Sequence, residues 1–116
     1  MERVSGAGAE SDLAQKQCRS CEGAVKPLPA EEIKTYLEQL ENWELSEGKI
    51  VRRFKFKNYY ETTAFTNAVA WIAHQQDHHP DICFGYKQCE VSYFTHAVNG
   101  LTENDFICAA KIDSLI

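Results

Sequence analysis

The histidines of this chain are grouped closely enough to act together in proton transfer or in metal binding. All four lie within residues 74–96, at His74, His78, His79 and His96. Histidine titrates near neutral pH, so two histidines in one site can donate and accept protons within the same reaction. His74 and His78 are four residues apart and would share one face of a helix that continued through both.

This spacing alone leaves three interpretations open. The histidines fit surface residues, because cations favour the carboxyl end of a helix. They fit zinc ligands, since His74 and His78 have the HxxxH spacing and His96 could supply a third ligand. A metalloprotease needs Glu directly after the first histidine, however, and Gln75 occupies that position. They also fit general acids and bases that act without a metal.

Helix-capping signals lie on both sides of the histidines. Asn58 can cap a long helix, with Glu61 at the capping-box position. This helix should end before Pro80, because the residue preceding a proline avoids helical geometry. Thr102 can cap a last helix, with Asp105 three residues later. The histidines are therefore expected near the end of one helix and before the start of the next.

Short runs of alternating apolar and polar residues, separated by turn residues, predict two pairs of antiparallel strands. The predicted strands cover 43–46, 49–56, 82–86 and 88–96, and a first helix is predicted from about 29 to 40. The order is then α-β-β-α-β-β-α. It indicates an α+β fold in which a four-stranded antiparallel sheet carries three helices packed on one face.

The last predicted strand has one face that is more apolar than the other. Cys89, Val91, Tyr93 and Thr95 alternate onto this face, which we expect to meet the helices. His96 ends the strand on the opposite face, where loops and strand ends usually gather binding chemistry.

The sequence divides into a polar leading segment and a folded domain. Residues 1–27 are rich in glycine, alanine, serine and charge, and they lack the apolar periodicity of a helix or strand. We predict a flexible arm over 1–27 and a single domain over 28–116. Cys18 and Cys21 form a CxxC pair in the arm, which fits an inert segment, half of a zinc site or a redox pair.

Composition argues against several classes of function. The net charge of −5 disfavours a general nucleic-acid-binding protein, which is usually basic. No apolar run approaches the roughly 20 residues that span a bilayer, so no membrane association is expected. The leading segment lacks the apolar core of a secretory signal. We therefore expect a cytoplasmic protein, with its five cysteines as thiols.

Short motifs around the histidines form a specific combination. Residues 74–81 read His-Gln-Gln-Asp-His-His-Pro-Asp, and an aromatic-rich strand then leads to Thr95 and His96. Residues 100–102 read Gly-Leu-Thr and precede Asp105, while 42–43 read Asn-Trp and 54–56 read Phe-Lys-Phe. Together these motifs resemble the signature of the pterin-4a-carbinolamine dehydratase family, over about residues 28–116.

The resemblance implies an α+β fold and a dehydratase, a hydro-lyase that acts without metal or organic cofactor. Its substrate would be 4a-hydroxytetrahydropterin, such as 4a-hydroxytetrahydrobiopterin, and its products quinonoid dihydropterin and water. This reaction recycles the pterin cofactor of aromatic amino acid hydroxylases, although some family members act in molybdopterin metabolism. The resemblance thus favours acid–base catalysis over a zinc site.

Carried over by position, the resemblance implies a set of catalytic and substrate-binding residues. The catalytic residues are His78, His79 and His96. The substrate-binding residues are Trp43, His74, Pro80, Thr95 and Asp105. Two of these have structural alternatives, because Asp105 also suits a helix cap and tryptophan is commonly buried for packing.

Partners follow from the same resemblance. Family members are usually homodimers or homotetramers, and a small domain with one uncovered sheet face also favours self-association. Some animal members additionally serve as dimerisation partners of a homeodomain transcription factor. A coactivator role is therefore implied here by family analogy alone.

Overall fold

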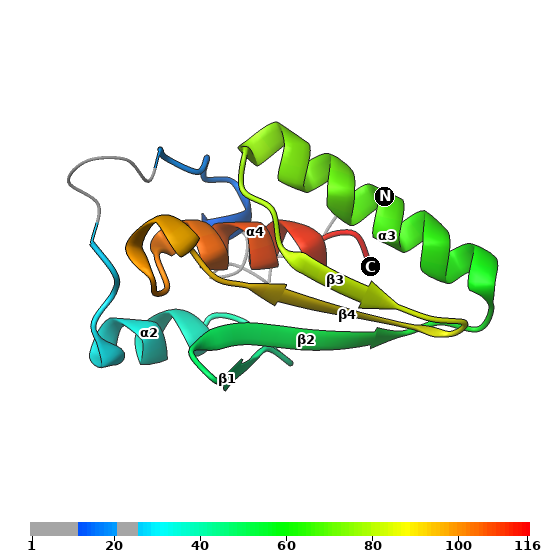
Figure 1. Ribbon diagram of the computed structural model, residues 1–116, viewed down its shortest axis with the longest axis horizontal. Coiled ribbons are helices and arrows are strands. Elements are labelled where there is room, and N and C mark those ends of the chain that lie inside the picture. Colours follow the sequence, from blue (N-terminus) through cyan, green and yellow to red (C-terminus); the bar gives the residue numbers. More distant parts are fainter. Residues whose placement is uncertain (1–11, 21–25) are drawn as a thin grey trace.

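A four-stranded antiparallel sheet forms one layer of the structure, and helices cover it (Figure 1). The computed structural model describes residues 12–20 and 26–116. The elements are α2 (Ala30–Leu37), β1 (Glu44–Ser46), β2 (Lys49–Lys55), α3 (Tyr59–Gln76), β3 (Asp81–Phe84), β4 (Gln88–Tyr93), the 3-10 helix η2 (His96–Val98) and α4 (Glu103–Asp113). The predicted α+β class and the order of the strands and main helices are confirmed.

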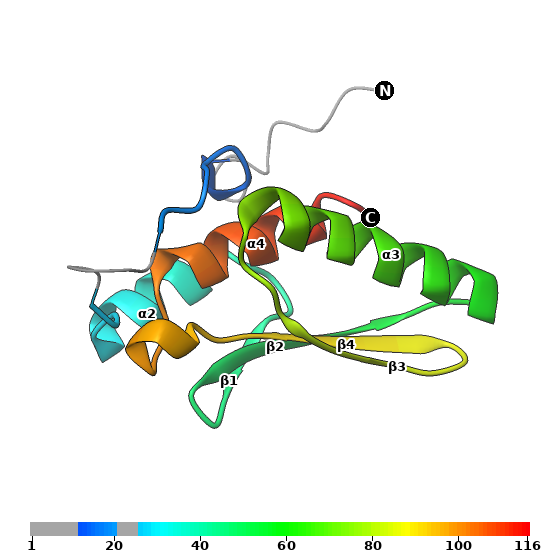
Figure 2. The same cartoon turned by 45° about the horizontal axis from the view of Figure 1, so that its top comes forward.

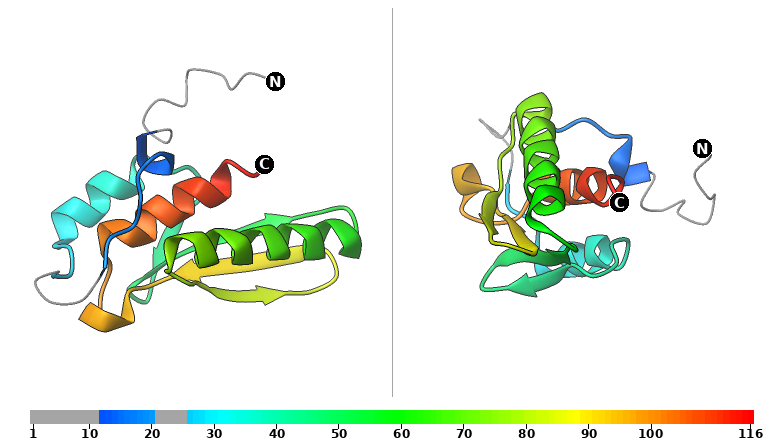
Figure 3. Two further views of the ribbon diagram at one scale, coloured as in Figure 1. Left: turned by 90° about the horizontal axis from the view of Figure 1, so that it is seen from above. Right: turned by 90° about the vertical axis from the view of Figure 1, so that its right-hand side faces the viewer.

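The strands lie in the order β1-β2-β4-β3, and every neighbouring pair is antiparallel. The helices α2, α3 and α4 lie on the same side of this sheet (Figures 2 and 3). The turn between β1 and β2 is formed by Glu47 and Gly48, which both have positive φ angles, of 52° and 81°. Such a two-residue turn matches the twist of paired strands.

The hydrophobic core lies between the sheet and the helices. Ile50 and Phe54 of β2 are buried, and so are Cys89, Val91 and Tyr93 of β4. Thr95 continues the same alternation and is also buried, so the predicted assignment of the apolar face is confirmed. The helices contribute further buried side chains, which include Val69, Ile72, Phe106 and Ile107.

The long helix α3 begins and ends as local signals require. The Asn58 side chain accepts a hydrogen bond from the Glu61 backbone N–H at 2.8 Å, and the Glu61 carboxylate accepts one from the Lys57 N–H at 3.3 Å. The helix ends at Gln76, and the next residue, Asp77, has a left-handed φ of 53°. The backbone N–H of His78 bonds to the Ala73 carbonyl across this turn, at 3.1 Å. Such a closure satisfies the last carbonyls of a helix.

This turn corrects the expectation that His74 and His78 share a helical face. His74 lies in the last turn of α3, whereas His78 follows the left-handed residue and is outside the helix. The HxxxH spacing therefore does not form a helical pair of ligands.

The chain after β4 also differs from the prediction. The strand ends at Tyr93, and His96 begins η2 instead of ending a strand. Thr95 and Gly100 pair with each other across this turn, with the Thr95 N–H 2.9 Å from the Gly100 carbonyl. This pairing turns the chain back before His96 can continue the sheet.

Residues 12–20 correct the expectation of a flexible arm over 1–27. Leu13 is 1% exposed and belongs to the hydrophobic core. Lys16 forms an ion pair with Glu103 at 2.6 Å, and Lys111 donates a hydrogen bond to the Ala14 carbonyl at 2.6 Å. The segment therefore lies against α4 (Figure 3). Cys21 and the rest of the predicted arm, 1–11 and 21–25, lie outside the described residues.

Within the described residues, no helix combines the length and apolarity needed to cross a membrane.

Candidate active site

A pocket of about 530 Å³ lies where the end of α3, the turn after β4 and the segment 12–20 meet. Three of the predicted catalytic histidines, His78, His79 and His96, line it together with Thr95. They come from two connections that are distant in sequence. The structure therefore brings the predicted catalytic residues together in one place.

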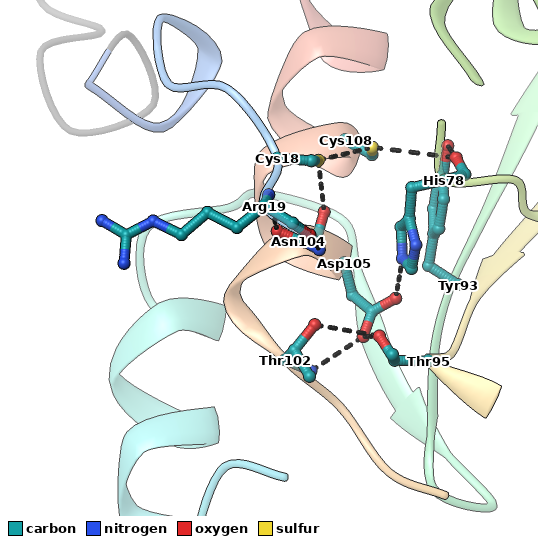
Figure 4. A network of polar contacts seen from close by, with 9 residues as sticks. All are labelled: Cys18, Arg19, His78, Tyr93, Thr95, Thr102, Asn104, Asp105 and Cys108. Atoms are coloured by element: carbon teal, nitrogen blue, oxygen red, sulfur yellow. Dashed lines mark hydrogen bonds and ion pairs between the residues drawn. The ribbon is translucent and has the colours of Figure 1, made fainter. Parts of the chain in front are cut away.

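The centre of this site is a contact between His78 and Asp105. His78 Nε2 lies 2.7 Å from Asp105 Oδ1, and the Asp105 side chain is fully buried (Figure 4). The His78 side chain is 11% exposed. A buried carboxylate that accepts a hydrogen bond from one ring nitrogen fixes the orientation and tautomer of the imidazole.

The other carboxylate oxygen of Asp105 is held by the start of α4. Oδ2 accepts a hydrogen bond from the Thr102 N–H at 2.9 Å and another from the Thr95 hydroxyl at 2.7 Å. Thr102 and Asp105 thus form the predicted capping box. The structural and site interpretations of Asp105 hold together, because one oxygen caps the helix while the other contacts His78.

The opposite side of His78 is held by Tyr93. The two rings stack with centroids 5.3 Å apart and planes 13° apart, and the Tyr93 hydroxyl donates a hydrogen bond to the His78 carbonyl at 3.3 Å. Burial raises the pKa of Tyr93 well above its usual value, so its hydroxyl stays protonated and continues to donate at neutral pH. His78 is therefore fixed through both its ring and its backbone.

His79 and His96 are more accessible than His78. Both are exposed to solvent, and both line the pocket. The His96 ring meets the Phe94 ring edge to face, with centroids 5.1 Å apart. An exposed histidine can exchange its proton with water between turnovers, which a buried carboxylate cannot do as readily.

Two of the predicted substrate-binding residues lie in an adjoining hollow. His74 and Pro80 line a second pocket of about 360 Å³, which also touches His78 and His79. His74 is exposed, and its ring lies 5.2 Å from that of Trp71. His74 is therefore a neighbour of the main pocket and not one of its walls.

Trp43 is the predicted site residue that the structure places elsewhere. It is 6% exposed, packs against Phe54 in the core, and donates from Nε1 to the Asp113 carboxylate at 2.9 and 3.0 Å. Arg52 binds the same carboxylate at 2.7 Å. Of the two interpretations, the structure favours packing for Trp43 over a wall of the pocket.

The segment 12–20 supplies pocket residues that sequence reasoning missed. Cys18, Arg19 and Ser20 line the pocket beside the histidines, and Asn104 completes this side. Cys18 Sγ lies 3.5 Å from Cys108 Sγ. Leu13, which anchors the segment, is an isolated apolar residue and shows no periodicity in the sequence.

The described residues contain no group of three or more His, Cys, Asp or Glu side chains placed to hold a metal ion. The arrangement that does exist is a histidine backed by a buried carboxylate, in a pocket shared with two further histidines. Such an arrangement contains the side chains that general acid–base chemistry uses.

Comparisons with known proteins place this chain in a family. Residues 26–115 match the family model described as pterin 4 alpha carbinolamine dehydratase. A protein of Nitrosomonas eutropha that carries the name pterin-4-alpha-carbinolamine dehydratase is 59% identical over 106 residues, covering 90% of this chain and 94% of that protein. The chain therefore belongs to the pterin-4-alpha-carbinolamine dehydratase family, whose members are hydro-lyases.

Solved structures agree with this assignment. A protein from Brucella melitensis described as a transcriptional coactivator/pterin dehydratase has a TM-score of 0.75 and 32% identity, covering 78% of this chain and 98% of that one. A pterin dehydratase-like protein described as a RuBisCO assembly factor in the alpha-carboxysome has a TM-score of 0.53 and 28% identity, covering 63% of this chain and 84% of that one. The resemblance inferred from the motifs is confirmed.

Proposed function

We propose that this chain dehydrates 4a-hydroxytetrahydropterin to quinonoid dihydropterin by histidine acid–base catalysis. The observation that carries the proposal is the His78–Asp105 contact of 2.7 Å beside a pocket that His79 and His96 also line. Family membership supports a pterin as the substrate.

The reaction needs one proton delivered and one removed. The hydroxyl on C4a leaves as water after it gains a proton, and the N5 lone pair forms the new C4a–N5 double bond. N5 then loses its proton to a base. A positioned acid and a positioned base each contribute typically about 10²- to 10⁴-fold to such a step.

The contact with Asp105 suits His78 to the role of base. The carboxylate accepts the Nε2 proton, which leaves Nδ1 as the ring nitrogen that can take a proton from N5. The buried negative charge then stabilises the imidazolium that forms, as in other enzymes with paired histidine and carboxylate. His96, exposed at the start of η2, is assigned as the acid that protonates the leaving hydroxyl.

The remaining histidines have lesser roles. His79 is assigned to orienting the substrate, because it lines the same pocket and forms no ion pair with a carboxylate of the described residues. His74 and Pro80 shape the adjoining hollow. For the physiological setting, we infer recycling of the pterin released by aromatic amino acid hydroxylases, in the cytoplasm, by a homodimer or homotetramer.

The proposal is tested by following the dehydration of synthetic 4a-hydroxytetrahydropterin spectrophotometrically, with and without the protein. We expect acceleration of at least about 10²-fold over the spontaneous reaction. We also expect the rate to persist in EDTA, because the assigned steps use side chains alone. A rate equal to buffer would refute the proposal, and activity lost in EDTA and restored by zinc would favour a metal site instead.

A further inference from the structure

The segment formed by residues 12–20 contacts the two helix ends beside the His78–Asp105 pair, which are the carboxyl end of α3 and the amino end of α4. We propose that it is a positioning element for this pair, which ties the carboxyl end of α3 to the amino end of α4 and closes one side of the pocket. The catalytic consequence rests on the proposed function, whereas the structural consequence for His78 and Asp105 does not.

The first link is to α3. The backbone N–H of Cys18 donates to the side-chain oxygen of Gln76 at 2.9 Å. Gln76 is the last residue of α3 and lies two positions before His78. The left-handed turn at Asp77 separates the two, so holding Gln76 fixes the point from which the His78 loop departs.

The second link is to α4 and consists of two hydrogen bonds between Arg19 and Asn104. The Arg19 N–H donates to the Asn104 side-chain oxygen at 3.0 Å, and the Asn104 amide donates back to the Arg19 carbonyl at 2.6 Å (Figure 4). Asn104 directly precedes Asp105 and is buried. Breaking hydrogen bonds at a buried amide leaves polar groups without partners, so this link resists displacement.

A third contact lies behind His78 itself. Cys18 Sγ is 3.5 Å from Cys108 Sγ, and Cys108 Sγ lies 4.0 Å from the His78 carbonyl, to which it donates (Figure 4). The hydrogen bond with Cys108, followed by burial, raises the pKa of the Cys18 thiol far above its usual value, so Cys18 packs as a neutral thiol. The segment therefore supports the loop from its rear.

These links require the segment to be anchored independently of the pocket. Leu13 is inserted in the core, Lys16 pairs with Glu103, and Lys111 holds the Ala14 carbonyl. All three anchors lie on the same segment before it reaches Cys18. These three contacts hold the segment, which we call the brace, before it reaches the two helix ends.

The need for such a brace follows from the short contact at the site. The orientation of His78 depends on its distance to Asp105, and a displacement of about 1 Å in a catalytic group can cost as much as 10²-fold in rate. His78 lies beyond the end of α3 and Asp105 lies in the first turn of α4. Helix ends fray more readily than helix interiors. A segment bonded to both ends opposes their relative motion.

The test compares substitutions that cut the links with one that does not. Asn104→Ala removes both bonds to Arg19, and Gln76→Ala removes the acceptor of the Cys18 N–H. Gln76→Glu keeps the oxygen that accepts from the Cys18 N–H and loses only the amide that donates to Gln17 Oε1 at 3.1 Å, so it serves as the conservative rescue. Asn58→Ala removes the cap at the opposite end of α3 and controls for a general loss of stability.

Two readouts are used on the full-length chain. The first is the NMR resonance of the His78 Nε2 proton, which a buried carboxylate partner protects from exchange with water. We expect it to broaden or disappear in Asn104→Ala and Gln76→Ala and to persist in Gln76→Glu and Asn58→Ala. The second is dehydration of 4a-hydroxytetrahydropterin, where kcat should fall about 10-fold in the first two variants with little change in KM.

Each outcome decides the inference. A resonance and a kcat that match the wild type in folded Asn104→Ala and Gln76→Ala would overturn it. An equal loss in Asn58→Ala would overturn it as well, because the effect would then be one of stability. If Asn104→Ala does not fold, the comparison of Gln76→Ala with Gln76→Glu tests the inference alone. If the wild type shows no dehydration, the proposed function fails while the resonance still tests the brace.

Discussion

His78 Nε2 lies 2.7 Å from Asp105 Oδ1, and the Asp105 carboxylate has no surface exposed to solvent. Its second oxygen is already bonded to Thr95 and Thr102, so the carboxylate cannot turn away from the histidine. The start of α4 and the loop after α3 are thereby joined through one side chain.

Asp105→Asn should lower kcat by about 10²-fold or more, because a neutral amide neither fixes the His78 tautomer nor stabilises its charged form. The matched control is Glu61→Gln, which likewise replaces a carboxylate by an amide in the first turn of a helix, in α3 and away from the pocket. Steady-state kinetics with folded variants checks this. Equal kcat values for the two variants would contradict the role of Asp105.

Because Tyr93 is buried, the free energy of unfolding should fall in alkaline solution. Burial raises its pKa in the folded state, while an unfolded tyrosine ionises at about pH 10. The stabilising contribution is therefore complete below about pH 10 and is lost progressively as the pH rises above it, by about 1.4 kcal/mol per pH unit.

The measurement is urea unfolding between about pH 8 and pH 11, a range that includes the pKa of an unfolded tyrosine. Tyr93→Phe should show a shallower alkaline decline in the free energy of unfolding than the wild type. Tyr60→Phe should leave the decline unchanged, because Tyr60 is exposed. Parallel declines in all three proteins would show that Tyr93 does not carry the effect.

Gly100 sits where two chain segments approach closely. A Cβ at this position would lie 2.7 Å from the Pro27 Cβ, beside the hydrogen bond of 2.8 Å between the Leu28 N–H and the Leu101 carbonyl. Gly100→Ala should therefore cost about 1–3 kcal/mol of stability through overpacking. Gly85→Ala is the control, since its Cβ would meet nothing within 4 Å. Indistinguishable thermal midpoints would refute the close approach.

Leu13 tests whether the segment 12–20 belongs to the folded structure. Leu13→Ala should cost about 2–5 kcal/mol, because it empties a site within the core. Leu45→Ala, at an exposed position of β1, should change stability by less than about 0.5 kcal/mol. Chemical denaturation of both variants decides the matter. A Leu13→Ala variant as stable as the wild type would restore the flexible arm.

The parts of the fold set by local chemistry were predictable from the sequence. Asn58 caps α3 through the Glu61 N–H, and Thr102 with Asp105 forms the capping box of α4, so neighbouring residues alone define both helix starts. The alternation along β4 likewise identified the face that meets the helices. Each of these signals is complete within a few residues.

Features that depend on contacts between distant residues were not predictable in the same way. His96 leaves the sheet because Thr95 pairs with Gly100, and Trp43 turns to the core because Asp113 accepts its N–H. The role of segment 12–20 depends on the burial of Leu13 in the core, which no periodicity in the sequence predicts. For the site, the family motifs identified the histidines but not the residues of that segment.

Substitutions of His79 and His74 should affect the kinetic constants differently from substitutions of His78 and His96. His79→Ala should mainly raise KM, because it orients the substrate, whereas His74→Ala should be mild, because His74 lies in the adjoining hollow. Both side chains are exposed, so both variants should fold. A large fall in kcat for His74→Ala would require a different assignment of roles.

The central claim is that His78 and His96 carry the proton transfers, and the most direct measurement is kcat for 4a-hydroxytetrahydropterin in His78→Ala and His96→Ala. Circular dichroism first establishes that each variant is folded. We predict that each substitution lowers kcat by about 10²-fold or more with a modest change in KM, and that the double variant loses less than the product of the two. Near-wild-type turnover in both folded single variants would contradict the account.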